Sequence, residues 1–138
     1  MAFTDLPQDP SRIRLSDPAH LPDMLDLVVS EKDRRRGALV VLLCDDQYRL
    51  RAPVVLGDLP DELTQDERER ALSLFITATG GRGAVLVAVA RADGLSLRPG
   101  DTMWLRAAER ACQGGPRLLG VHVVTLDGSR EVTDALAA

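Results

Sequence analysis

The segment AVLVAVARADGLSLRPGD, residues 84–101, decides how this chain folds. Its first seven residues are continuously apolar, a pattern typical of a strand that is covered on both faces of its sheet. A polar loop follows, and Asp101 then stands where a capping residue would begin a helix. A strand, a loop and a helix in this order predict an α/β unit, and the carboxyl end of such a strand is the usual place for a ligand site.

Other segments carry strand signals of their own. Pro53 has no amide hydrogen, so its strand is expected at an edge of the sheet or on a bulge. Asp127-Gly128 is a strong signal for a two-residue hairpin. Strands are predicted at 38–44, 48–56, 84–90, 118–125 and 129–133.

Three helices are predicted, over 21–32, from a capping box at Thr64 to about 79, and from Asp101 onward. Gly80-Gly81 is interpreted as the stop of the second helix. The fold class expected is therefore α/β: a single domain with a mixed sheet flanked by helices over 19–138, preceded by an irregular arm over 1–18. The inward residues expected on the second and third helices are Ala71, Leu74, Phe75 and Ala78, and Trp104, Ala108, Ala111 and Cys112.

The composition is that of an ordinary globular protein. A chain of 138 residues fits one domain, and a net charge of −4 argues against a nucleic-acid partner. The basic cluster Arg34-Arg35-Arg36 is interpreted as a solvated entry to the first strand, in preference to an anion or nucleic-acid contact. There is no apolar run long enough to span a membrane and no secretion signal, so a cytoplasmic location and no membrane partner are expected.

The sequence offers little for metal or nucleophilic chemistry. The possible soft metal ligands, His20, His122, Cys44 and Cys112, have no paired ligand spacing, so no metal and no cofactor are expected. His122 is interpreted as a neutral, hydrogen-bonded histidine within a strand. Ser96 could approach it, but a turn serine is the simpler interpretation, and no catalytic residue is predicted. Gly80–Gly83 precedes a strand instead of opening a helix, which argues against a phosphate cradle.

Three stretches together resemble the RadC-like branch of the JAB (JAMM) metallopeptidase superfamily. They are RGALVVLLCDDQYRL, TQDERERALSLFITATGGRGAVLVAVA and DGLSLRPGD, and the similarity spans about residues 34–126. The resemblance implies the JAB arrangement of sheet and helices, which is cytidine-deaminase-like. In that family a His-x-His pair and an Asp at a helix start bind zinc, a Glu on the first strand acts as general base, and a Ser assists.

Carried over to this chain, the family's chemistry is almost entirely missing. The His-x-His positions fall on Ala88 and Ala90, the Ser on Arg98 and the Glu on Gly37, so that only Asp101 is retained. A slip in the alignment does not restore the site, because no histidine lies between Asp45 and Arg117. The resemblance therefore implies a JAB-like domain without its metal site.

Two kinds of function follow from these observations. We expect a non-catalytic binding or scaffold domain, whose protein partner or second copy would use an edge strand or the groove beside residues 91–100. The alternative is an enzyme or a small-anion-binding protein with a relocated site formed by Arg91, Arg98 and Asp101. An Asp101 that caps the helix would work against such an anion.

Overall fold

The two continuous apolar segments form the centre of the sheet. β1 (Ala38–Cys44) and β3 (Ala84–Ala90) pair antiparallel over their whole length. In the computed structural model, which describes residues 18–57, 59–60 and 62–133, every residue of each strand except the sixth is buried. The bounds of both strands are those predicted, because strands covered on two faces are continuously apolar from end to end.

The sheet has five strands in the order β2-β1-β3-β4-β5. β2 (Leu50–Gly57) is antiparallel to β1 at one edge, β4 (Arg117–Thr125) is parallel to β3, and β5 (Gly128–Glu131) is antiparallel to β4 at the other edge. This mixed sheet with its helices confirms the α/β fold class, and Pro53 lies on an edge strand as predicted. The last hairpin is also confirmed, although Gly128 already pairs with Thr125.

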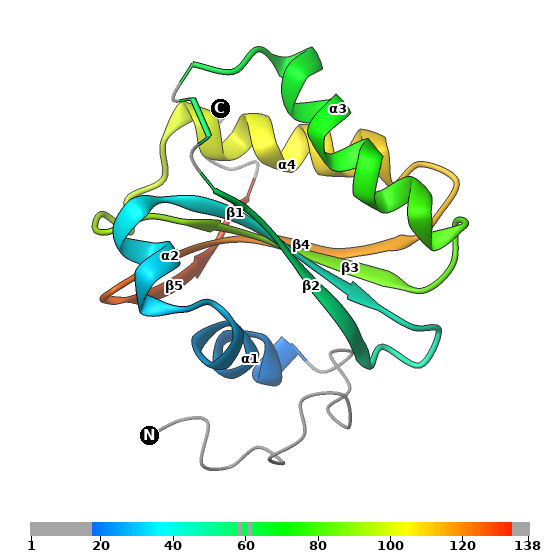
Figure 1. Cartoon of the computed structure of the whole chain (residues 1–138), viewed down its shortest axis with the longest axis horizontal. Coiled ribbons are helices and arrows are strands. Elements are labelled where there is room, and N and C mark those ends of the chain that lie inside the picture. The colour runs from blue at the N-terminus through cyan, green and yellow to red at the C-terminus, as the bar shows by residue number, and fades with distance from the viewer. Residues whose placement is uncertain (1–17, 58, 61, 134–138) are drawn as a thin grey trace.

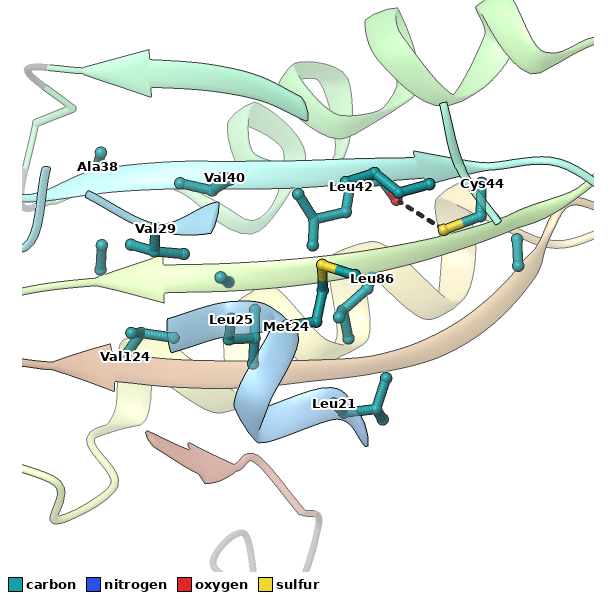
Figure 2. Close-up of a cluster of buried hydrophobic side chains, with 14 residues drawn as sticks. Leu21, Met24, Leu25, Val29, Ala38, Val40, Leu42, Cys44, Leu86 and Val124 are labelled. Atoms are coloured by element: carbon teal, nitrogen blue, oxygen red, sulfur yellow. Dashed lines mark hydrogen bonds between the residues drawn. The ribbon is translucent and has the colours of Figure 1, made fainter. Parts of the chain in front are cut away.

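Helices cover both faces of the sheet (Figure 1). α1 (Leu21–Val28), preceded by the 3₁₀ turn η3 (Pro18–His20), packs on one face, and α3 (Gln65–Ile76) and α4 (Pro99–Ala111) pack together on the other. Figure 2 shows the first interface, where Met24 and Leu25 of α1 lie against the strands. The strand residues that this interface buries alternate with those facing α3 and α4, and include Val40, Leu42, Leu86 and Val124.

The predicted inward face of the second helix is wrong. Leu74 is 75% exposed, and the buried residues of α3 are Arg68, Leu72 and Ile76. This stripe has helical spacing but begins with an arginine, so a search for apolar residues misses it. The capping box between Thr64 and Glu67 is confirmed, and after the 3₁₀ turn η4 (Thr77–Thr79) Gly80 ends the helix in a left-handed conformation.

The first predicted helix is in fact two. α1 ends at Val28, and Ser30 caps a second short helix, α2 (Glu31–Arg36), by accepting a hydrogen bond from the amide of Asp33. The predicted arm over 1–18 lies outside the described residues except for Pro18, where η3 begins. In the described part of the chain, every helix is too short or too polar to cross a bilayer.

The interpretation of Arg34 as a solvated residue is wrong. Its side chain is buried, and the guanidinium donates to the carbonyls of Leu25, Asp26 and Val29 at the end of α1 and to that of Thr125 at the end of β4. The last carbonyls of a helix have no partner within the helix. Arg34 supplies that partner for Asp26 and Val29 and fastens α1 to the sheet.

We predict that Arg34→Gln lowers the free energy of unfolding by about 2–4 kcal/mol, because it removes charged donors and leaves buried carbonyls unpaired. Arg35→Gln is the matched control. Arg35 pairs with Glu31 on an exposed helix surface, and its loss is expected to cost at most about 0.5 kcal/mol. Urea denaturation of the two variants measures the difference, and equal costs would contradict this role of Arg34.

Candidate functional site

A pocket of about 440 Å³ opens where β3 ends and α4 begins. Its walls come from the first residues of β1, the last residues of β3, the first turn of α4 and single side chains of α2 and α3. We call it the arginine pocket, after Arg36, Arg68, Arg91 and Arg98, which line it together with Asp101. The remaining wall is largely apolar and includes Leu59, Pro60, Val89 and Trp104.

The side chain of Arg91 joins the two ends of the loop between β3 and α4. Its guanidinium forms a two-fold ion pair with Asp101, with Nη1–Oδ1 at 2.7 Å and Nη2–Oδ2 at 3.1 Å. It also donates to the carbonyl oxygens of Gly94 and Ser96. The side chains of Arg91 and Asp101 are only 13% and 4% exposed, so this pair is a buried clamp, and most donors of Arg91 are already used.

Asp101 does not begin the helix as predicted. α4 begins at Pro99, a residue favoured at a first helical position, and Asp101 is two residues further on. Its Oδ2 accepts a hydrogen bond of 2.7 Å from the amide of Arg98. Asp101 is thus an acceptor for the helix start and the counter-ion of Arg91, and this pairing offsets the repulsion that its charge would exert on a bound anion.

Arg98 has a different environment. It is exposed at the rim of the pocket, and its guanidinium has no hydrogen bond or ion pair with any described residue. The guanidinium lies over Gly94, where a Cβ would come within 2.9 Å of its Nη2. The structure therefore brings the three predicted residues, Arg91, Arg98 and Asp101, to one site, but only Arg98 among them keeps a free cationic group.

Arg68 is the residue that the sequence analysis missed. It is only 5% exposed, its guanidinium lies 5.2 Å from the ring centre of Trp104, and its Nη1 donates to the carbonyl of Leu63. Its Nε is buried without a hydrogen-bond partner in the described residues. Burial lowers the pKa of Arg68, although the charges of Asp101 and Glu67 act in the opposite direction. The available signal was its helical spacing to Leu72 and Ile76.

The positions that the JAB resemblance assigns to catalysis can also be located. Gly37, Ala90, Arg98 and Asp101 all line the arginine pocket. Ala88 does not, because it is fully buried in the core beneath α1. Among the residues that the structure describes, no three His, Cys, Asp or Glu side chains gather in a way that could hold a metal ion.

The other candidate residues lie elsewhere. Val121 and Val123 face α4, so His122 between them faces the side of α1, and no hydrogen bond joins it to Ser96 in the described chain. The prediction that His122 is hydrogen-bonded is wrong for its Nε2, which has no partner among the described residues. Cys44 and Cys112 are free and buried, and burial raises their pKa values to about 12 and about 11, so both thiols are protonated at neutral pH.

Comparisons with known proteins identify no relative of this chain. No family model matches the chain, no curated protein is significantly similar to it, and no solved structure matches it significantly. The resemblance to the RadC-like branch therefore rests on the sequence pattern, and it stays a prediction.

Removing the charge of Asp101 should release the clamp. We predict that Asp101→Asn lowers the free energy of unfolding by about 3 kcal/mol, because Arg91 would remain buried without its counter-ion. Asp93→Asn, an equal change at an exposed residue of the same loop, is expected to change it by at most about 0.5 kcal/mol. Chemical denaturation tests both, and equal effects would show that the ion pair does not hold the loop.

His122 should make stability dependent on pH. Burial lowers its pKa below the usual 6.5, and the charge of Glu131 opposes this only in part. The unfolded chain therefore takes up a proton near pH 6.5 that the folded protein does not. We predict that the free energy of unfolding of the protein falls as the pH drops from about 7.5 to 5.5. The free energy of unfolding of the His122→Asn variant should fall less over this range. Denaturation curves at both pH values measure the slope, and parallel slopes would contradict the prediction.

Proposed function

We propose that this chain is a non-catalytic binding domain whose arginine pocket holds a small anionic ligand. The observation that carries the proposal is Arg68, a buried guanidinium that lines the pocket and forms no ion pair with a described residue. A buried charge without a paired counter-charge is costly, and an anion bound in the pocket would pair with it.

The charges of the pocket support an anion as the ligand. Arg91 and Asp101 neutralise each other, whereas neither Arg68 nor Arg98 forms an ion pair with a described residue. Both line the same pocket beside the amino end of α4, where the helix dipole also favours negative charge. A guanidinium presents several donors in a plane, which suits carboxylate and phosphate oxygens.

The resemblance to JAB metallopeptidases supports the non-catalytic part of the proposal. Where that family places its general base, one zinc-binding histidine and its serine, the pocket has Gly37, Ala90 and Arg98. Glycine and alanine carry no group that could bind zinc or activate water. In this interpretation the domain keeps the position of the family's site, alanines stand at its two histidine positions, and Arg98 stands at its serine position.

A protein partner or a second copy at an edge strand remains a further prediction. Both edges carry features that limit strand addition: Pro53 on β2 has no amide hydrogen, and β5 has only four residues. These features favour the pocket over the edges as the place of binding. Size-exclusion chromatography with light scattering at high protein concentration tests self-association, and a monomer mass would exclude it.

Anion binding can be tested by thermal denaturation. We expect phosphate, sulfate and citrate to raise the Tm by several degrees above chloride at equal ionic strength, because ligands of the folded state stabilise it. Arg98→Gln should remove most of this shift, whereas Arg106→Gln, which removes an exposed charge from the same helix outside the pocket, should retain it. Equal shifts in both variants would contradict the proposed site.

A further inference from the structure

The size of the arginine pocket exceeds what a bare ion needs. Its volume of about 440 Å³ lies in the range of about 300–1,000 Å³ that is typical of sites for small organic molecules. Beside the arginines, the pocket offers the apolar side chains of Leu59, Pro60 and Val89. The ligand that fits both kinds of wall has an anionic end and a short apolar body.

The anionic end has to satisfy two guanidinium groups. Neither Arg68 nor Arg98 forms an ion pair with a described residue, and the charges of Asp101 and Glu67 act on Arg68 only from a distance, so a ligand with two negative charges pairs with both guanidinium groups better than one with a single charge. A phosphate monoester carries a charge of about −1.5 to −2 at pH 7 and offers three acceptor oxygens. A monocarboxylate or a sulfate ester carries only one charge.

The first turn of α4 brings one further donor to the same place, the amide of Gly100, because Pro99 has no amide hydrogen and the amides of Arg98 and Asp101 already donate within the turn. Gly100, the second residue of the helix, lies beside Arg68, and a Cβ at this position would come within 3.1 Å of the Nη2 of Arg68. The guanidinium can approach the helix start because position 100 has no side chain. An amide at a helix start can donate to a phosphate oxygen, and here the guanidinium of Arg68 lies next to the amide of Gly100.

We infer that the ligand of the arginine pocket is a phosphate monoester of a small organic molecule. Its phosphate lies between Arg68, Arg98 and the amino end of α4, and its organic part lies against Leu59, Pro60 and Val89. This inference rests on the proposed anion-binding function and adds the charge and the shape of the ligand to it.

The single tryptophan of the chain provides the measurement. Trp104 lines the pocket beneath the guanidinium of Arg68, so its fluorescence should change when a ligand engages that arginine. The probes are n-butyl phosphate, n-butyl sulfate, n-pentanoate and inorganic phosphate, none of which absorbs at the excitation wavelength. They are titrated into the full chain at pH 7.5, where the phosphate ester is mainly a dianion.

We expect n-butyl phosphate to bind at least about ten-fold more tightly than each of the other three probes. Arg98→Gln should weaken its binding about ten-fold, and Arg106→Gln should leave it unchanged. Arg68→Lys, which keeps the charge but loses the planar fork, should also weaken it. If this buried substitution prevents folding, the exposed Arg98 variant still decides the outcome.

Each other outcome overturns a defined part of the argument. If the sulfate ester or pentanoate binds as tightly as n-butyl phosphate and its binding depends on Arg98, the site binds anions, but the inference of a doubly charged ligand is wrong. If inorganic phosphate binds as tightly as n-butyl phosphate, the inference that the ligand carries an organic group is wrong. If no probe binds and the anions raise no Tm, the proposed function itself is wrong.

Discussion

The burial of β1 and β3 on both faces is the constraint on which the rest of the structure depends. Their backbone groups must pair within the sheet, and their side chains need an apolar cover above and below. α1 provides one cover, and α3 and α4 together provide the other (Figure 1). Since α4 must start beside the end of β3, the loop between them forms one wall of the pocket as a direct result of this layering.

Buried arginines have two distinct roles in this protein. Arg34 and Arg91 donate to carbonyl groups that would otherwise be unpaired, and Asp26 and Asp101 balance their charges. Both are explained by the fold alone. Arg68 makes one hydrogen bond and one ring contact, but it forms no ion pair with a described residue and it lines the pocket. The lack of an ion pair with a described residue thus distinguishes Arg68 from Arg34 and Arg91.

The fold could largely be predicted from sequence, because its main signals are local. Continuous apolar runs gave the two central strands, Pro53 marked the edge strand, and Thr64 marked the start of α3. The site could be predicted only in part. Arg91, Arg98 and Asp101 are close in sequence and meet in space, whereas Arg68 reaches Trp104 only through the packing of α3 on α4. A contact between two helices has no signature in the local sequence. In addition, an arginine among the buried residues of α3 interrupts the apolar pattern by which a buried helix face is recognised.

The clamp between Arg91 and Asp101 fixes the shape of the loop independently of any ligand. It ties two residues ten positions apart, so the intervening segment is ordered before any ligand arrives. For the ligand that we propose, such a preformed frame would lower the cost of ordering the loop on binding. The same independence has an evolutionary consequence. Asp93, exposed at the tip of this loop, takes no part in the clamp, so evolution can exchange it without loss of the frame.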